Sequence, residues 1–236
     1  MSSDSAERVM VIVAHPDDAE FIAAGTVARW AREGREITYT VCTNGNKGTD
    51  DPTITPEQLA AMRESEQNAA AAVLGVRRVV FLGYNDGELQ PTPDLRRSIT
   101  RVIRRYRPYT VITMDPTVRF FGDDYMNHPD HRAAGDAACD AIFPAARDRL
   151  YFPELLAEGL EPHKVKETYL AGTLSPNIWI DIADTLKVKI AALLEHRSQI
   201  GDASGAERLV CTWAEEAARG HNLRYAEAFR RITLPD

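Results

Sequence analysis

Two short segments of the chain, HPDD at residues 15–18 and HPDH at residues 128–131, place imidazole and carboxylate groups within four positions. Turns usually contain glycine, asparagine and serine, so two adjacent acids after a histidine are an unusual turn composition. The first and last residues of each segment are three apart. At the start of a helix, that spacing places both side chains on one side of the first turn. These two segments are therefore the candidates for reactive chemistry.

The residue types in these segments favour metal-dependent hydrolysis. Two neutral imidazoles and one carboxylate that leave coordination positions open are a ligand set of catalytic zinc. The same set suits non-haem Fe(II), so the ligand types leave both metals open. Asp17, next to a ligand, would take a proton from metal-bound water, and a second histidine would stabilise an oxyanion or protonate a leaving group. Since a metal lowers the pKa of bound water to about 7, the pattern predicts cleavage of an amide or ester at neutral pH.

The elements that must position these segments alternate between strand and helix over the first two thirds of the chain. Apolar runs typical of buried strands occupy residues 8–15, 36–43, 77–83 and 109–114. Helical spacing covers residues 19–34, 55–75, 92–108 and a segment from about Pro129. The alternation predicts an α/β fold, a Rossmann-like and mostly parallel sheet with helices on both faces.

Beyond Arg149 the alternation is less regular. Two further strands are expected at 166–172 and 177–182, and helices near 183–200 and 205–232. No repeat or linker interrupts the chain. We therefore expect a single domain over residues 1–236, in which residues 150–236 complete a Rossmann-like core at 1–149.

Sheet topology brings the two segments together. Ligands of open α/β sheets bind at the carboxyl ends of the strands, where the strand order reverses. In the common order 3-2-1-4-5, the first and fourth strands are neighbours, and HPDD and HPDH follow these two strands. Each motif alone has a simpler explanation. A histidine at the end of a strand can hydrogen-bond to the backbone. Asp17 or Asp18 can cap the following helix, and HPDH can form the first turn of another. Their meeting in one crevice is what favours a metal site.

Composition limits the kinds of partner and the cellular location that we expect for this protein. The net charge of −7 disfavours nucleic acid, anionic membranes and polyanionic substrates. No apolar run has the roughly 20 residues of a membrane span, and the polar N-terminus lacks the pattern of a signal peptide. Three cysteines without a pattern (Cys42, Cys139, Cys211) predict a reducing cytoplasm. The apolar residues of segment 206–232 would pack on their own domain or on a second subunit, which leaves a homo-oligomer open.

Several strings of the sequence together identify a family. AHPDDAEFIAAG and HPDHRAAG, with TNGNKG, MRESEQNAAAAVLG, GYNDGEL and LLEHRSQI, resemble the zinc-dependent N-acetylglucosaminyl deacetylases, the PIG-L or LmbE-like family. Its members remove acetyl from N-acetylglucosamine carried on inositol, malate or other groups. The resemblance implies a zinc-dependent hydrolase that removes an N-acetyl or related N-acyl group from such an amino sugar or glycoconjugate. An amidase on a thiol or sugar conjugate and a non-catalytic metal-binding or carbohydrate-binding relative are the alternatives.

The resemblance also implies roles for individual residues. His15, Asp18 and His131 match the zinc ligands of the family. Asp17 matches its general base. His128 matches the residue that acts as general acid or stabilises the oxyanion.

Three further residues match the surroundings of the family's site. Asp130 lies where a carboxylate orienting a histidine is expected. Arg63 matches an arginine that binds sugar hydroxyls, and Asp86 lies near a substrate-binding aspartate. The plain alternatives are a solvated helix-surface arginine and a turn aspartate.

Two rival enzyme classes are less favoured. A dinucleotide-binding oxidoreductase would need glycines in the first strand-to-helix turn, where this chain has AHPDDAEF, and the two acids would repel phosphate. An Fe(II) oxygenase would use the same metal ligands, but such enzymes are found mostly on β-scaffolds.

Overall fold

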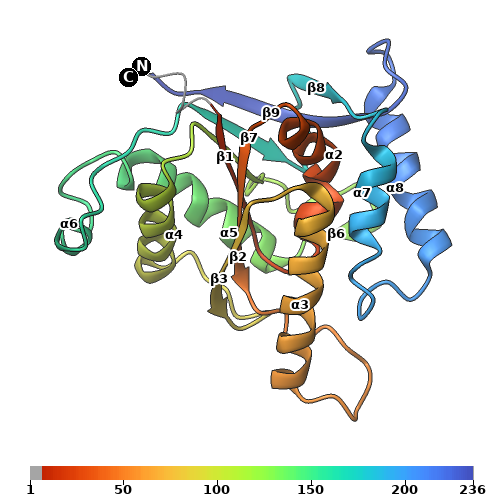
Figure 1. Cartoon of the computed structure of the whole chain (residues 1–236), viewed down its shortest axis with the longest axis horizontal. Coiled ribbons are helices and arrows are strands. Elements are labelled where there is room, and N and C mark those ends of the chain that lie inside the picture. Colours follow the sequence, from red (N-terminus) through yellow and green to blue (C-terminus); the bar gives the residue numbers. More distant parts are fainter. Residues whose placement is uncertain (1–6, 236) are drawn as a thin grey trace.

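A seven-stranded sheet forms the centre of the computed structural model, which describes residues 7–235 (Figure 1). Its strands are β1 (Arg8–Val13), β2 (Glu36–Thr43), β3 (Arg78–Tyr84), β4 (Thr110–Met114), β7 (Glu167–Ala171), β8 (Ile178–Asp181) and β9 (Ala226–Thr233). The helices are α2 (Asp18–Arg32), α3 (Pro56–Leu74), α4 (Pro93–Tyr106), α5 (Pro129–Asp140), η1 (Ala141–Ala145), α6 (Glu154–Ala157), α7 (Leu186–Leu193) and α8 (Ala203–Ala218). A small hairpin of β5 (Phe120–Phe121) and β6 (Tyr125–Met126) lies in the loop before α5.

The strand order is β3-β2-β1-β4-β7-β9-β8. The first five strands in this order pair in parallel, and β9 pairs antiparallel with both β7 and β8. Figure 1 shows α2, α3, α7 and α8 on one side of the sheet and α4 and α5 on the other. The expected single-domain α/β fold with a mostly parallel sheet is confirmed, and β1 and β4 are neighbours as the topology rule predicts.

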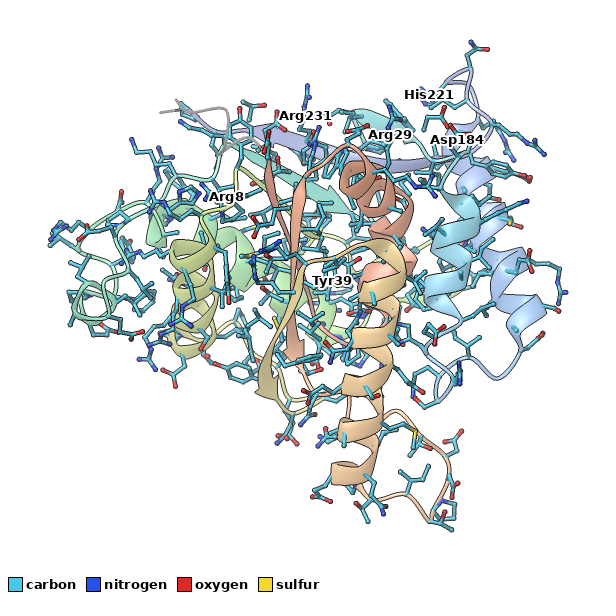
Figure 2. The ribbon with its side chains drawn as sticks, viewed as in Figure 1. Arg8, Arg29, Tyr39, Asp184, His221 and Arg231 are labelled. Carbon is cyan, nitrogen blue, oxygen red and sulfur yellow. The ribbon has the colours of Figure 1, made fainter. Side chains whose placement is uncertain are left out.

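The apolar run of β1 is explained by helices on both faces. Val9 and Val11 pack into the core beneath α2, whereas Met10 and Ile12 pack into the core beneath α4 and α5. Successive side chains of a strand point to opposite faces, so a strand covered on both faces needs a continuous apolar run. Tyr39 of β2, labelled in Figure 2, is fully buried in the first of these cores.

Local signals set the ends of the helices on both sides of the site. Thr55 and Gln58 form a capping box at the start of α3, which ends at Gly75 in a left-handed conformation. Pro129 is the first residue of α5, and His128 precedes it as the N-cap. These helix starts agree with the sequence prediction.

The helix expected over residues 205–232 is wrong in its second half. Helix α8 ends at Ala218, Gly220 and Asn222 adopt positive φ angles, and residues 226–233 form strand β9. Strands β7 and β8 offer β9 backbone hydrogen bonds on both sides, which outweigh its helical pattern. The helix expected over 183–200 is also shorter, because α7 ends at Leu193. Within residues 7–235, no helix is long and apolar enough to cross a bilayer.

Candidate metal centre

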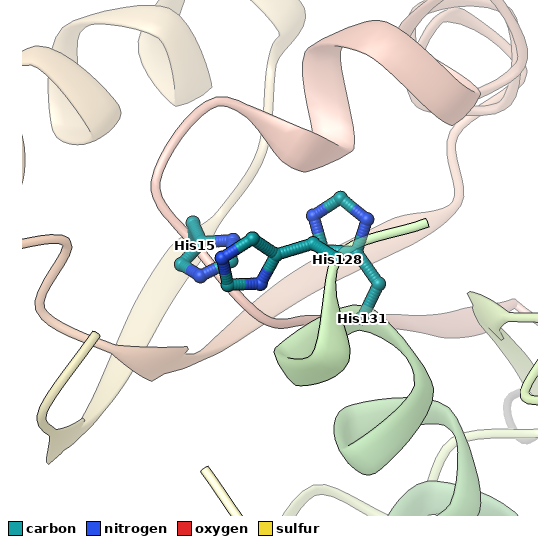
Figure 3. A group of neighbouring side chains, drawn as sticks. All are labelled: His15, His128 and His131. Carbon is teal, nitrogen blue, oxygen red and sulfur yellow. The ribbon is translucent and has the colours of Figure 1, made fainter. Parts of the chain in front are cut away.

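The HPDD and HPDH segments meet at the carboxyl ends of β1 and β4. The centroid of the His15 ring lies 4.7 Å from that of His128 and 5.2 Å from that of His131 (Figure 3). The three imidazoles, from the loop after β1 and from the start of α5, offer nitrogen atoms that lie within 4.8 Å of one another. The meeting of the two segments is therefore present in the fold.

Asp18, the first residue of α2, lies between two of these histidines. Its Oδ2 is 3.4 Å from Nδ1 of His15, and its Oδ1 is 3.1 Å from Nε2 of His131. Ligand atoms on a tetrahedral zinc, each about 2.0–2.2 Å from the metal, are separated by about 3.3–3.6 Å. The two nitrogen–oxygen distances, each to a different oxygen of Asp18, are close to this separation.

The other ring nitrogen of each of these histidines has an oxygen partner. Nε2 of His15 lies 3.2 Å from Oδ2 of Asp130 and 3.1 Å from Oδ1 of Asp86. Nδ1 of His131 lies 3.0 Å from Oδ1 of Asn127. Metal-binding histidines typically donate the far N–H to a carboxylate or carbonyl oxygen, which leaves the near nitrogen as a lone-pair donor. The outer contacts of both histidines thus fit a metal held on the Asp18 side.

Asn127 was not expected at the site. It is buried, and its Nδ2 donates to the carbonyl of Val118 at 2.7 Å, which turns its Oδ1 toward His131. Its position directly before HPDH, four residues from His131, is the signal that would have indicated it.

Three carboxylates, those of Asp18, Asp86 and Asp130, lie next to His15 and favour a positive charge there. Burial opposes the charged imidazole, but the charge of Asp18 and hydrogen bonds to Asp130, Asp18 and Asp86 raise the pKa of His15 to about 12. Burial likewise opposes ionisation of Asp18. The adjacent His131 and His15 nevertheless hold the pKa of the Asp18 carboxyl well below its usual range. A buried crevice with this excess of carboxylates favours a divalent cation.

Asp17 lies beside the candidate ligands, next to Asp18 in the chain. It occupies the N-cap position of α2, but its side chain makes no capping hydrogen bond, so the plain capping role does not describe it. Its Oδ2 accepts a hydrogen bond from Nη2 of Arg63 at 3.1 Å. Burial and the charge of Asp18 raise the pKa of Asp17 to about 7, against the lowering effect of Arg63 and two histidines. A carboxylate with a pKa near neutrality is suited to accept a proton.

His128 and Asp130 flank the start of α5. Nδ1 of His128 accepts the backbone N–H of Asp130 at 3.1 Å. Burial and the charge of His15 lower the pKa of His128, which keeps its imidazole neutral at pH 7. The Asp130 carboxylate is fully buried and accepts the N–H groups of Gly87 (2.7 Å) and Leu89 (3.3 Å) as well as contacting His15. It ties α5 to the loop after β3.

Arg63 and Asp86 are buried and contact residues of the site. Arg63 is 4% exposed, so it is not a solvated surface arginine, and it donates to the carbonyls of Gly45 and Pro16 as well as to Asp17. Asp86 is 8% exposed and contacts His15, with its Oδ2 3.9 Å from Nη1 of Arg63. Both residues reach the site, and their contacts are with the protein. The substrate-binding roles implied by the resemblance stay predictions.

Comparisons with known proteins identify the family of the chain. A family model described as GlcNAc-PI de-N-acetylase (PIG-L) matches residues 10–142. The diacetylchitobiose deacetylase of Thermococcus kodakarensis is 34% identical over 193 residues, covering 82% of this chain and 70% of that protein. A probable N-acetyl-alpha-D-glucosaminyl L-malate deacetylase 2 of Bacillus anthracis is 29% identical over 199 residues, 81% of either chain. The solved structure of N,N'-diacetylchitobiose deacetylase from Pyrococcus horikoshii has a TM-score of 0.90 at 31% identity, covering 97% of this chain and 84% of that chain. The resemblance expected from the sequence is confirmed, and the chain belongs to the PIG-L family.

Proposed function

We propose that this chain is a zinc-dependent hydrolase that removes the N-acetyl group, or a related N-acyl group, from an N-acetylglucosamine-type sugar. Membership of the family makes the chain an amide hydrolase, and the relatives are named as deacetylases of diacetylchitobiose and of an N-acetylglucosaminyl malate. The observation that carries the proposal is the arrangement of the two histidines around Asp18. His15 and His131 each turn one nitrogen toward its carboxylate and the other toward a buried oxygen.

In this proposal His15, Asp18 and His131 hold Zn²⁺, which supplies Lewis acidity and an acidified water when it is bound. Asp17 accepts a proton from the water that attacks the amide carbon. The neutral His128 faces the oxygen on which negative charge develops. Asp17 then returns the proton to the departing amine, so that water and the amide become a carboxylic acid and a free amino sugar.

The remaining residues of the proposal act through these groups. Asp130 orients His15 by accepting its outer N–H, and Arg63 holds Asp17. Asp86, which lies close to His15 and Arg63, is assigned to the substrate side of the crevice.

The first experiment measures metal content and turnover together. Protein purified without added metal is analysed by elemental analysis beside an Asp18→Ala variant, and both are assayed for amine release from N-acetylglucosamine and N,N'-diacetylchitobiose. We expect close to one zinc per chain, lost in the variant together with turnover. If the unmodified protein contains iron and the variant does not, the site stands and its metal is iron in place of zinc. A chain that binds no metal even after zinc is supplied would refute the proposal.

An Asp17→Asn variant tests the proposed base. The amide keeps the shape of the side chain and an oxygen for Arg63, so metal content and stability should stay near those of the unmodified protein. General-base catalysis contributes about 10²–10⁴-fold, and kcat should fall by that order. Near-normal turnover would mean that another group takes the proton.

Two further proposals concern the setting of the enzyme. All three cysteines are free thiols (Cys42, Cys139, Cys211), which supports a reducing cytoplasm as its location. Self-association is proposed through α8, where Leu209 and Trp213 are exposed, and sedimentation velocity tests it.

The small-molecule partner in this proposal is the amino-sugar substrate.

A further inference from the structure

Two side chains of helix α3 form hydrogen bonds with the two ends of the peptide group between Pro16 and Asp17. Its carbonyl, on Pro16, accepts Nη2 of Arg63 at 2.6 Å, and its N–H, on Asp17, donates to Oε1 of Gln67 at 3.0 Å. Arg63 and Gln67 are four residues apart in α3, so they lie on the same face one turn apart. Arg63 is 4% exposed and Gln67 is fully buried, which shields both hydrogen bonds from water.

The residue held in this way has an unusual backbone. Asp17 has φ 101° and ψ −28°, a left-handed conformation that residues other than glycine rarely adopt. Such a conformation persists only where the surrounding structure enforces it. Because the side chain of Asp17 makes no capping bond, the enforcement comes from the peptide group and from Arg63. The orientation of the carboxylate therefore follows from the orientation of this peptide.

Gln67 is itself held in one orientation. Its Nε2 lies 3.1 Å from both carboxylate oxygens of Glu20, so the amide nitrogen faces Glu20 and the amide oxygen faces Asp17. Glu20 is fully buried in α2, and its Oε2 lies 3.1 Å from Nε2 of the fully buried His196. A buried chain of hydrogen bonds thus runs from His196 through Glu20 and Gln67 to the backbone of Asp17.

We propose that Gln67 is a positioning residue for the hydrolytic reaction, kept in register by Glu20 and His196, and that it sets the direction of the Asp17 carboxylate. The inference rests on the proposed function of Asp17 as the base. A purely structural role, in which the same bonds only attach α2 to α3, would affect stability without a specific effect on turnover.

The first variant is Gln67→Met, which has a similar length and offers no strong acceptor to the Asp17 N–H. We expect kcat on an N-acetylated amino sugar to fall by about 10- to 100-fold, the effect of a misplacement of roughly 1 Å, with KM and metal content little changed. In the Asp17→Asn background, Gln67→Met should cause no further fall, because the group that it positions is already lost.

A charge-preserving exchange tests the orientation directly. Gln67→Glu alone places two carboxylates against each other and should be impaired. Adding Glu20→Gln restores an amide–carboxylate pair with reversed polarity, in which Glu at position 67 still offers an oxygen to Asp17 and Gln at position 20 still offers one to His196. The double exchange should recover most of the lost kcat.

Two measurements separate positioning from general destabilisation. Leu74→Ala, at the buried far end of α3, should lower stability without lowering kcat. Amide hydrogen exchange of residues 14–22 in metal-free protein should be faster in Gln67→Met than in Leu74→Ala. Unchanged kcat in Gln67→Met beside an inactive Asp17→Asn would overturn the inference, as would a full additional loss in the Asp17→Asn background. If Asp17→Asn is itself fully active, the proposed function of Asp17 fails instead.

Discussion

The close approach of α5 to the end of β4 gives a sharp test of how the site is positioned. A Cβ at Gly135 would lie 2.5 Å from the carbonyl oxygen of Met114 and 3.2 Å from the nitrogen of Pro116. Both neighbours are main-chain atoms, which cannot rotate away as a side chain can. The Gly135→Ala variant therefore requires α5 to move outward by roughly 0.9 Å to restore ordinary contact.

This movement would reach the candidate metal centre, because the N-cap and the first turn of α5 supply His128, Asp130 and His131. Overpacking of this kind costs about 1–3 kcal/mol, and alanine recovers about 1 kcal/mol through its better helix propensity. The expected net loss of stability is therefore up to about 2 kcal/mol. Moving Nε2 of His131 away from Asp18, now at 3.1 Å, should weaken metal binding by about 10- to 100-fold.

Denaturant unfolding of the metal-free protein measures the first effect, and competition with a chelator for zinc measures the second. Gly201→Ala is the matched control, because no atom lies within 4 Å of the added Cβ, and its stability should change by less than about 0.5 kcal/mol. If Gly135→Ala binds zinc as tightly as the unmodified protein, the contact between α5 and β4 does not determine the position of His131, and the reasoning is refuted.

Three further predictions concern single contacts. Asn127→Ala removes the oxygen that faces Nδ1 of His131. Zinc affinity, measured by competition with a chelator, should fall about 10- to 100-fold. Asn127→Asp keeps an oxygen at this position and should retain more of the affinity. Lys189→Met leaves the buried Glu227 carboxylate without its ion-pair partner, 2.7 Å away, and should lower the free energy of unfolding by about 3–5 kcal/mol in urea titrations at pH 7; a loss below 1 kcal/mol would contradict this. Burial lowers the pKa of His163 to about 4, whereas the unfolded chain has the usual value near 6.5, so its contribution is present above pH 6.5 and is lost as the pH falls toward 4. Metal-free protein should therefore lose up to about 3 kcal/mol over that window, and a His163→Gln variant with an equally steep loss would show that another group is responsible.

Much of the architecture was predictable because its causes are local. Thr55 and Gly75 bound α3 through their own side-chain and backbone preferences, and the alternate burial of β1 residues matches its continuous apolar run. The order of the first four strands follows from the topology of parallel sheets, and it brings HPDD and HPDH together. The residue types then indicate a metal-dependent hydrolase, which the family comparison supports.

Strand β9 shows where local reasoning fails. Residues 226–233 carry a helical pattern, but β7 and β8 provide hydrogen-bond partners on both sides. Glu227 in this strand accepts the N–H groups of Gly25 and Thr26 in α2, some two hundred residues away, and pairs with Lys189. No short window of sequence contains these partners.

The fine geometry of the site was likewise decided by the tertiary structure. The sequence by itself determined which residue types meet and which chemistry they support. Which imidazole nitrogen faces Asp18 depends on the buried oxygens of Asp130 and Asn127 behind the histidines. The left-handed backbone of Asp17 depends on α3, whose Gln67 lies fifty residues further along the chain. Hydrogen-bond partners this distant are chosen by packing, because their spacing in the sequence carries no periodic signal.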